Sequence, residues 1–487
     1  MCLREEADSM KKILFVSSEA VPFIKTGGLA DVAGTLPKSF NKDEFDVRVV
    51  IPKYRAIPEH YRNQMKYRTH FYMDFAGENR YVGVMELEWG GITFYFIDNE
   101  YYFYGDKPYE DGVWDLEKFA YFSKASLSIL PLIDFRPDVV HCHDWQTGLV
   151  PVYLKTDFCR GDFFARMKAV MTIHNLKFQG TWNPKDIMNI TGLPGYLFTP
   201  DKLEAYKDAN YLKGGLVYAD WITTVSPTYA EEIKMPFYGE GLNGLLCARS
   251  GQLSGILNGI DYDEYNPETD HALPYNYNAI NFRKVKVKNK LALQEELGLE
   301  QNEHKFMIGL VSRLTDQKGL DLVAYMMDQI CTEDTQLVVL GTGDSKYENM
   351  FRHFAWKYPE RVSANIFYSD ERSHKIYGSC DAFLMPSLFE PCGLSQLMSL
   401  RYGTVPIVRE TGGLRDTVQP YNEYESTGTG FSFANYNAHE MMDIINYAKH
   451  IYYDKKREWN KIIDRAMAAD FSWNMSARRY EDLYRML

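Results

Sequence analysis

Short apolar segments that alternate with helical ones constrain the fold of this chain more than any other feature of its 487 residues. Most are too short and too uniformly apolar for half-exposed strands, which is typical of parallel strands buried on both faces. The first series comprises Ile13–Ser18, Val47–Ile51, Ile92–Ile97, Val139–Cys142, Val170–His174 and Ile222–Val225. The second comprises Met307–Ser312, Gln336–Leu340, Asn365–Tyr368, Phe383–Met385, Val405–Val408 and Gly430–Phe433. The alternation predicts an α/β fold with parallel sheets covered by helices on both faces.

Two such series predict two doubly wound, Rossmann-like domains, because single cores stop growing at roughly 250–300 residues. The expected first domain is 10–262, followed by a hinge at 263–290, where Asn, Tyr, Pro and His cluster without periodicity. The expected second domain is 291–460, and a helical segment at 461–487 is expected to pack back on the first domain. Residues 1–9 are polar and acidic, and we expect a disordered or artefactual extension there. Open α/β sheets bind ligands at the carboxyl ends of their strands, so the cleft between the two domains is the expected site.

Charge and cysteine usage exclude several classes of partner. The net charge is -12, which opposes binding to a nucleic acid. No apolar run approaches the roughly 20 residues needed to span a bilayer, and the N-terminus is unlike a signal or transit peptide. The seven cysteines are scattered and lack a Cys-x-x-Cys pair, which is typical of a reducing compartment. We therefore expect a cytoplasmic protein without membrane or nucleic-acid partners.

One six-residue pattern, Thr-Gly-Gly-Leu-x-Asp, occurs twice, at Thr26–Asp31 and at Thr411–Asp416. Each copy follows a predicted strand and opens a predicted helix. Glycines let a ligand approach the backbone, and a helix start offers free N–H groups and a positive dipole end. Lys25 precedes the first copy and suits a diphosphate, although a glycine-tightened loop with a solvated Lys25 is the alternative. Glu410 precedes the second copy, which would therefore rely on backbone N–H groups.

Two further loops carry charges at predicted strand ends. Arg313 and Lys318 share one loop, and fixed cations stabilise charge growing on a leaving diphosphate without a metal; an exposed polar loop is the alternative. Glu390 lies between a strand and a helix, where a carboxylate could bind sugar hydroxyls or face a reacting carbon. Its alternative is a carboxylate favoured by the helix dipole. Cys392 could be only a small buried hydrophobe.

Histidine and aspartate motifs give weaker signals. His141-x-His143 could bind zinc, but no third ligand lies at zinc-like spacing. Asp144 could cap a helix, and His174 ends the next strand, where a structural role and a ligand role are about equally supported. Asp261-x-Asp263 matches a manganese-binding pattern but lies at the expected hinge. We therefore expect no metal.

In this order and at these spacings, the motifs resemble those of bacterial glycogen synthases and plant starch synthases, which form glycosyltransferase family 5 with the two-domain GT-B fold. The resemblance runs from about Met10 to the C-terminus. The motifs that carry it are Lys25–Asp31, His143–Gln146, Thr172–Asn175, Gly255–Asp261, Ser312–Leu314, Glu390–Leu394 and Thr411–Leu414.

The resemblance implies a hexosyltransferase that transfers glucose with retention, typically from ADP-glucose, to the non-reducing 4-OH of an α-1,4-glucan such as glycogen or a maltooligosaccharide. The nucleotide sugar is a co-substrate, and no cofactor is implied. The sequence does not distinguish ADP-glucose from UDP-glucose and does not indicate an oligomeric state. The alternatives are another retaining GT-B glycosyltransferase and a catalytically inactive glucan-binding homologue.

The resemblance also assigns residue roles. It implies a catalytic set of His174, Glu390, Arg313 and Lys318. Glu390 is given an electrostatic and binding role, because retention fits a same-face attack through an ion-pair-like state. A paired-carboxylate mechanism is poorly supported, because the position eight residues on, where a second carboxylate stands in some sister families, is Met398. Donor-binding or site-shaping roles are implied for Lys25, Gly27, Gly28, Asp31, Asp144, Asn175, Asn258, Cys392, Gly393, Leu394, Thr411, Gly412 and Gly413.

Overall fold

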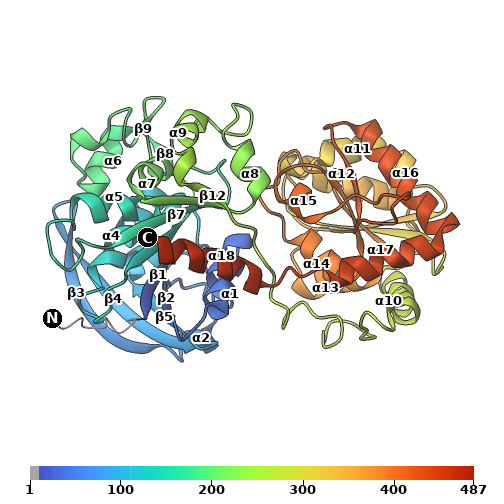
Figure 1. Ribbon diagram of the computed structural model, residues 1–487, viewed down its shortest axis with the longest axis horizontal. Helices are drawn as coiled ribbons and strands as arrows, with labels where there is room; N and C mark the ends of the chain where they lie inside the picture. The colour runs from blue at the N-terminus through green and yellow to red at the C-terminus, as the bar shows by residue number, and fades with distance from the viewer. Residues whose placement is uncertain (1–9, 111) are drawn as a thin grey trace, which may run out of the picture. The chain divides into compact units, whose positions relative to one another are not determined.

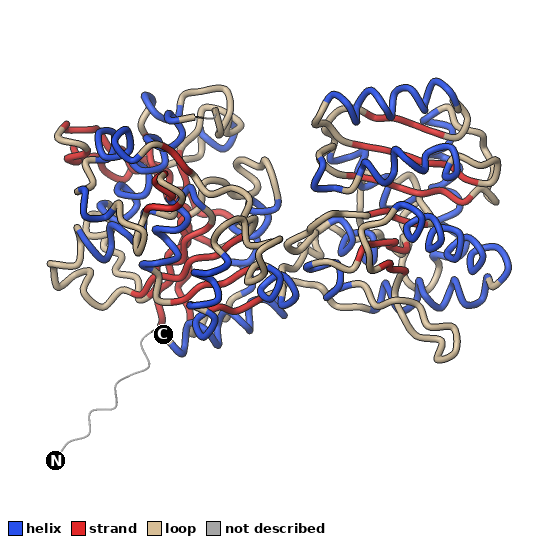
Figure 2. Tube along the Cα trace, turned by 90° about the horizontal axis from the view of Figure 1, so that it is seen from above, coloured by secondary structure: helices blue, strands red, loops and turns tan. Residues whose placement is uncertain are grey.

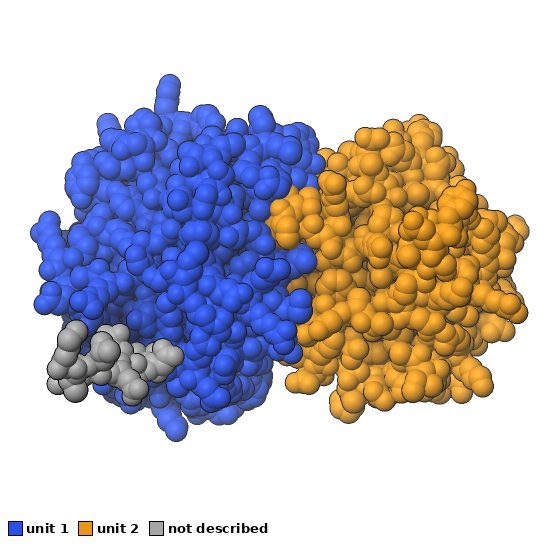
Figure 3. Space-filling view, viewed as in Figure 1, with its two compact units in different colours: residues 1–225, 230–257, 473–487 blue, residues 226–229, 258–472 orange. Residues whose placement is uncertain are grey.

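The computed structural model describes residues 10–110 and 112–487, so the extension expected at residues 1–9 lies outside the described residues. The chain forms two compact units (Figure 3). Unit 1 comprises the described residues up to Val225, then Ala230–Leu257 and Trp473–Leu487. Unit 2 comprises Ser226–Tyr229 and Asn258–Ser472. In each unit, strands run through the interior and helices lie around them (Figure 2).

Unit 1 is built on a nine-stranded sheet. Its order is β12 (Leu253–Gly255), β11 (Trp221–Thr224), β7 (Lys168–Ile173), β6 (Val139–His143), β1 (Lys11–Val16), β2 (Phe45–Pro52), β5 (Ile92–Asp98), β4 (Glu78–Trp89) and β3 (Lys66–Phe75). Strands from β12 to β5 pair in parallel, whereas β4 is antiparallel to both of its neighbours. The centre of the sheet is shielded from solvent, since Ile13–Val16 of β1 are fully buried. The expected doubly wound sheet is therefore present, with an antiparallel hairpin added at one edge.

Helices and a small second sheet complete unit 1 (Figure 1). The small sheet has the order β8 (Thr181–Trp182), β10 (Asp208–Asn210) and β9 (Glu204–Ala205). The helices are α1 (Gly28–Thr35), α2 (Glu59–Arg62), α3 (Glu100–Phe103), α4 (Val113–Ser128), α5 (Leu149–Thr156), α6 (Pro184–Thr191), α7 (Tyr211–Tyr218), α9 (Asn243–Ala248) and α18 (Trp473–Met486). A further helix, α8 (Pro227–Glu232), includes residues of both units.

Unit 2 contains a six-stranded, fully parallel sheet. Its order is β15 (Val362–Asn365), β14 (Thr335–Leu340), β13 (Phe306–Val311), β16 (Ala382–Met385), β17 (Val405–Arg409) and β18 (Phe431–Phe433). Its helices are α10 (Phe282–Leu297), α11 (Leu320–Ile330), α12 (Ser345–Lys357), α13 (Asp370–Ser379), α14 (Ser395–Arg401), α15 (Gly412–Thr417), α16 (Ala438–Asp454) and α17 (Lys456–Ala468). Figure 1 shows α11 and α12 on one side of this sheet and α10, α13, α14 and α17 on the other.

The boundaries of the units differ from the expected ones. After Leu257 the chain stays in unit 2 as far as Ser472, and the expected hinge at 263–290 is part of that unit. Its aromatic residues are the reason: Tyr277 is buried, and its hydroxyl donates to the carbonyl oxygen of Tyr402 at 2.6 Å. The sequence did not indicate this packing, because asparagine and proline interrupt any regular spacing of apolar residues in the segment.

The C-terminal segment also divides later than expected. Residues 461–472 stay in unit 2, where Trp459 and Ile462 of α17 lie in the hydrophobic core. Only Trp473–Leu487 belong to unit 1. There the hydroxyl of Tyr484 in α18 lies 2.6 Å from Nδ1 of His141 in β6.

Each expected strand overlaps an observed one, and the main displacement is at β15. We expected Asn365–Tyr368, but the strand is Val362–Asn365. The apolar side chains of Phe367 and Tyr368 misled the assignment, since they are 45% and 77% exposed after the strand has ended. Among residues 10–110 and 112–487, no helix is both long and apolar enough to cross a membrane.

Candidate functional site

The predicted site residues gather at one edge of each sheet. In unit 1, β1 and β6 are parallel neighbours, and the strand order reverses between them. The loops after these two strands therefore diverge and leave an open edge, the usual ligand position in doubly wound sheets. The loop of Lys25 follows β1, Asp144 follows β6, and His174 follows the next strand, β7.

Unit 2 repeats this arrangement with other residues. Its strand order reverses between β13 and β16, which are parallel neighbours. Arg313 and Lys318 lie on the loop after β13, and Glu390 lies on the loop after β16. The second copy of the repeated pattern follows β17, the strand beside β16. Each unit thus brings its own predicted site residues together at the edge where ligands bind in this architecture.

In unit 1, the loop that contains Lys25 is held by two carboxylates. The ammonium of Lys25 pairs with the carboxylate of Asp31 in the first turn of α1 at 2.8 Å. The backbone N–H of Thr26 donates to Oε2 of Glu19 at 2.6 Å. Lys25 is therefore pre-positioned beside the start of α1, although part of its charge is offset by Asp31 in the absence of an anion.

Glu19 was not predicted as a site residue. It is 2% exposed, and burial raises its pKa to about 7, while the hydrogen bond from Thr26 opposes this shift. A buried carboxyl group whose pKa is displaced toward neutrality is typical of functional sites. The available sequence signal was its position in the loop that follows β1, six residues before Lys25.

Asp144 acts on the backbone of the neighbouring loop. Its Oδ1 accepts the N–H of His174 at 2.7 Å and the N–H of Asn175 at 3.4 Å. Asp144 itself has a left-handed backbone with φ of 56°, which is uncommon for a residue other than glycine. Desolvation raises the pKa of Asp144 to about 7. The carboxyl group therefore holds the backbone of the loop that carries His174, and the expected role of Asp144 toward a donor sugar stays a prediction.

His174 is part of a pair of imidazoles. Its Nε2 lies 3.0 Å from Nδ1 of His143, so one ring donates a hydrogen bond to the other. Burial lowers the pKa of His174 to about 3 and that of His143 well below its ordinary value. Both rings are neutral at physiological pH. A contact from His174 to a ligand would therefore be a neutral hydrogen bond rather than a positive charge.

In unit 2, Lys318 and Glu390 form an ion pair. Nζ of Lys318 donates to Oε2 of Glu390 at 2.6 Å, and the hydroxyl of Ser387 donates to the same oxygen at 3.1 Å. Glu390 is 5% exposed, so its charge is compensated by these contacts rather than by bulk water. Ser387 was not predicted; its position three residues before Glu390 was the only signal.

Arg313 lies on the same loop as Lys318 but is exposed. Its guanidinium makes no hydrogen bond or ion pair with any residue that the structure describes. The loop itself is anchored, because the N–H of Leu388 donates to the carbonyl oxygen of Gln317 at 2.9 Å. The edge of unit 2 therefore presents one cation engaged with Glu390 and one that is available to an anion.

The two copies of the repeated pattern differ in what surrounds their glycines. A Cβ added at Gly27 would meet nothing within 4 Å. A Cβ at Gly412, whose φ is 46°, would lie 1.9 Å from the carbonyl oxygen of Glu390, and one at Gly413 would lie 2.2 Å from that of Cys392. The second copy is thus packed against the Glu390 loop, whereas the first is open to an approaching ligand.

The N–H of Gly413 is also engaged. It donates to the carbonyl oxygens of Glu390 and Pro391, each at 3.1 Å. We expected backbone N–H groups here to serve a ligand, but this one is used to hold the Glu390 loop. Asp416, the last residue of the second copy, accepts hydrogen bonds from the N–H and hydroxyl of Thr228 at 2.8 and 2.6 Å.

Two further predicted residues of unit 2, Cys392 and Asn258, are buried at the Glu390 loop. Cys392 is 4% exposed and Asn258 is 7% exposed, and the backbone of Asn258 hydrogen-bonds the thiol. The amide of Gln396, which was not predicted, donates to the carbonyl oxygens of Cys392 and Gly393, each at 2.9 Å. These hydrogen bonds therefore hold the backbone at the start of α14 in one shape, independently of a ligand.

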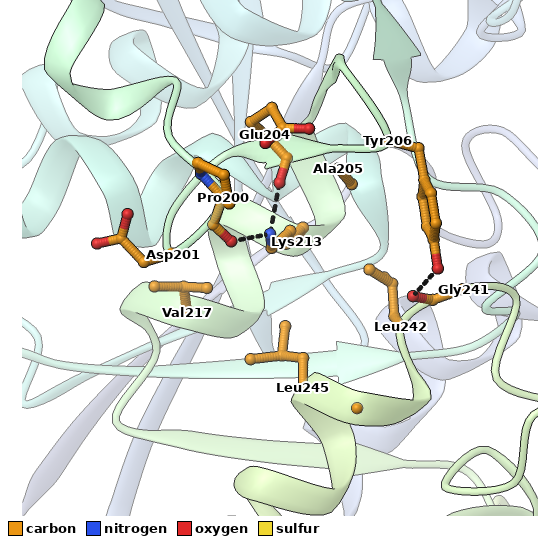
Figure 4. A pocket seen from close by; sticks show the side chains of 11 residues that line it. Pro200, Asp201, Glu204, Ala205, Tyr206, Lys213, Val217, Gly241, Leu242 and Leu245 are labelled. Atoms are coloured by element: carbon orange, nitrogen blue, oxygen red, sulfur yellow. Dashed lines mark hydrogen bonds between the residues drawn. The ribbon is translucent and has the colours of Figure 1, made fainter.

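Unit 1 also has a surface hollow of about 390 Å³ near the small sheet, and none of the predicted site residues lines it. Figure 4 shows Lys213 within it. Its ammonium donates to the carbonyl oxygen of Pro200 at 2.5 Å and to that of Glu204. Because the cation is already bound by carbonyl groups, this hollow lacks the charge arrangement found at the two sheet edges.

Comparisons with known proteins identify the family of the chain. Residues 12–248 match the family model described as the starch synthase catalytic domain, and residues 295–464 match that of glycosyl transferases group 1. A glycogen synthase of Lachnospira eligens is 72% identical over 98% of this chain and 100% of its own length. A glycogen synthase of Clostridium acetobutylicum is 49% identical over 97% of this chain and 99% of its own length. The chain belongs to the glycogen and starch synthase family.

Solved structures place this family member among GT-B glycosyltransferases. The catalytic domain of starch synthase IV from Arabidopsis thaliana, bound to ADP and acarbose, superposes with a TM-score of 0.89 at 30% identity. That match covers 98% of this chain and 99% of the plant domain. A sucrose-phosphate synthase from Thermosynechococcus elongatus shares the fold with a TM-score of 0.62 at 17% identity. The chain is therefore a glycosyltransferase with the GT-B fold, as its motif order predicted.

The contrast between the two glycine pairs of this synthase can be tested directly. Gly412→Ala should lower the thermal unfolding temperature, because a left-handed φ costs about 1–2 kcal/mol for a residue with Cβ and the added atom meets Glu390. Gly27→Ala should leave the unfolding temperature unchanged but raise KM for the sugar donor. Calorimetry and steady-state kinetics of the two variants would measure both effects.

Gly251→Ala is the matched control, because a Cβ there also meets nothing within 4 Å and the residue lies outside both edges. It should change neither stability nor KM. A loss of stability in Gly27→Ala similar to that in Gly412→Ala would contradict the difference between the two copies.

Asp144 predicts a specific pH dependence of stability. Its folded pKa is raised from 3.8 to about 7, so within this window the folded protein holds a proton that the unfolded chain releases. The stability contributed by the protonated carboxyl is full below the unfolded pKa and is lost as pH rises through the folded pKa. Asp144→Asn does not titrate, so its unfolding temperature relative to the native protein should rise between about pH 5 and about pH 8.

Asp106→Asn is the control, because the side chain of Asp106 is 93% exposed. Its difference in unfolding temperature from the native protein should be the same at about pH 5 and at about pH 8. A constant difference for Asp144→Asn would show that its carboxyl does not titrate in this window.

Proposed function

We propose that this protein synthesises glycogen by transferring glucose from ADP-glucose, with retention, to the non-reducing 4-OH of an α-1,4-glucan. The Lys318–Glu390 ion pair at the edge between β13 and β16, with exposed Arg313 on the same loop, is the observation that carries the proposal. It provides a held cation, a second cation that is free to meet a diphosphate, and a held carboxylate for a sugar within one small region. The relatives named as glycogen synthases support the same activity.

In the proposed reaction, the bond between C1 of glucose and the diphosphate oxygen breaks, and a bond from C1 to the acceptor O4 forms on the same face. The proton of the acceptor hydroxyl passes to the departing phosphate oxygen, so that ADP leaves. Negative charge grows on the diphosphate as the bond breaks, and Arg313 and Lys318 are proposed to stabilise it. Because Lys318 is held by Glu390 before the reaction, its charge needs little reorganisation as charge develops on the diphosphate.

Glu390 is proposed to stabilise the positive charge that grows on the glucose ring and to bind its hydroxyls. Its oxygen Oε2 is already shared by Lys318 and Ser387, which restrains the carboxylate and reduces its nucleophilicity. This favours an electrostatic role over a covalent one. The backbone of Cys392–Leu394, held by Gln396, is proposed to bind the same sugar.

Unit 1 is proposed to contribute the Lys25 loop and His174. An arriving phosphate would compete with Asp31 for the ammonium of Lys25, and the open surroundings of Gly27 would let it approach the backbone. Gly28 begins α1 and would offer its N–H at the positive end of that helix. His174, neutral and held by Asp144 and His143, is proposed to hydrogen-bond the transferring glucose.

The choice of ADP-glucose is supported by the structure of starch synthase IV, which is bound to ADP and acarbose. Transfer is proposed to need no metal and no cofactor, since Arg313 and Lys318 supply the positive charge. Asp261, the first residue of the Asp-x-Asp pattern, accepts the N–H of Asp263 at 2.9 Å within a local turn. The protein is proposed to act in the bacterial cytosol, in keeping with the bacterial relatives and with the free thiols of its six described cysteines.

Incorporation of labelled glucose into glycogen, from ADP-glucose and from UDP-glucose, tests this function. We expect α-1,4-linked incorporation from ADP-glucose that exceeds incorporation from UDP-glucose and persists in EDTA. Analysis of the product linkage by NMR checks retention. Absence of incorporation from either donor would contradict the proposed activity, and strong inhibition by EDTA would contradict the metal-free mechanism.

A further inference from the structure

Far along the sequence from these loops, unit 2 contains a histidine that faces two carboxylates. His374 and Asp370 lie four residues apart on α13 and therefore on the same helical face. Glu264 lies in the segment that follows the entry of the chain into unit 2. One nitrogen or oxygen atom from each of the three side chains lies within 4.8 Å of the other two. These residues play no part in the glucosyl transfer proposed above.

The imidazole of His374 is held in one orientation. Its Nδ1 lies 2.7 Å from Oδ2 of Asp270, a residue that is 7% exposed. Tyr402 donates its hydroxyl to the same oxygen at 2.5 Å, and the ring of Tyr265 stacks on the imidazole at a centroid distance of 4.9 Å. A histidine whose Nδ1–H is bound by a carboxylate presents a lone pair at Nε2, which is the usual arrangement around a metal ligand.

The Nε2 atom of His374 faces Asp370, and the two side chains form one cluster with Glu264. The side chain is only 7% exposed, and Nε2 has no hydrogen-bond partner among residues 10–110 and 112–487. Oδ2 of Asp370 lies 3.8 Å away, which is too far for a hydrogen bond. Buried polar atoms nearly always have a hydrogen-bond partner. A buried nitrogen without one, close to two acidic groups, therefore indicates that a further group binds there.

We propose that His374, Asp370 and Glu264 bind a divalent transition-metal ion, with Zn²⁺ as the best match. Imidazole nitrogen combined with carboxylate oxygen suits Zn²⁺, and three protein ligands leave a fourth position for water. Tetrahedral bonds of about 2.0–2.2 Å hold ligand atoms about 3.4 Å apart. The separations here need only modest rotations of Asp370 and Glu264, which are both exposed, toward the fixed imidazole.

The bound ion would join two parts of unit 2 that are distant in sequence. Glu264 follows the crossover at Asn258, and Asp370 and His374 open α13 beside the sheet. The ion would stabilise the start of unit 2 against local opening, because a ligand that binds only the folded state adds to its stability. This role is structural, so it is independent of the proposed function and is compatible with glucosyl transfer that persists in EDTA.

Titration of the intact, tag-free, EDTA-treated protein with Zn²⁺ alone by isothermal calorimetry at about pH 7.5 tests the proposal. We expect one site per chain, and Glu264→Gln and Asp370→Asn should each weaken binding at least about tenfold. Co²⁺ should bind the same site and give visible absorption bands that both variants reduce. Both changes are at exposed side chains, so they preserve the buried His374–Asp270 pair.

Glu371→Gln is the matched control, because Glu371 lies beside Asp370 on α13 but pairs with Lys375 at 2.9 Å. Its affinity for Zn²⁺ should equal that of the native protein. Absence of Zn²⁺ binding would overturn the proposal. Binding that is unchanged in Glu264→Gln and Asp370→Asn would overturn it as well, since the ion would then lie elsewhere.

Discussion

Parallel pairing of β13 with β16, and of β1 with β6, is the constraint on which the candidate site depends. Each pair lies where the strand order of its sheet reverses, so the loops that follow both strands leave the same edge in opposite directions. These buried strands, which are rich in β-branched residues, determine where the loops begin. Lys318 and Glu390 are 72 residues apart in the sequence, and only this pairing brings their side chains within 2.6 Å.

The repeated Thr-Gly-Gly-Leu-x-Asp pattern has different surroundings in each unit. In unit 1 the glycine at position 27 is open, and Asp31 pairs with Lys25. In unit 2 the glycines allow the backbone to touch the Glu390 loop, and Asp416 binds Thr228. Similar sequence therefore supplies a ligand-accessible loop once and a structural support once. The identity of the preceding residue, Lys25 or Glu410, already indicated that the two copies are unequal.

Much of the fold followed from the sequence because buried parallel strands are uniformly apolar, and the motif order identified the family. The β3–β4 hairpin was missed because β3 is mostly exposed and lacks such a run. The role of 263–290 was missed because its buried tyrosines have no regular spacing. Among site residues, Lys318 and Glu390 were expected from their places at strand ends. Contacts such as those from Glu19 to Thr26 and from His143 to His174 depend on side-chain directions across neighbouring segments, which sequence spacing does not fix.

In the proposed reaction Lys318 and Glu390 act as one unit, because each holds the other in place while Lys318 meets the negative charge of the diphosphate and Glu390 the positive charge of the glucose ring. A double-mutant cycle on kcat, with Lys318→Ala, Glu390→Gln and the combined variant, tests this claim most directly. We predict that each single change lowers kcat by about 10²–10³-fold, as loss of a pre-positioned electrostatic group does. The combined variant should be no slower than about the slower single variant, because groups that work together lose their effect together. A combined loss equal to the product of the two single losses would contradict the account.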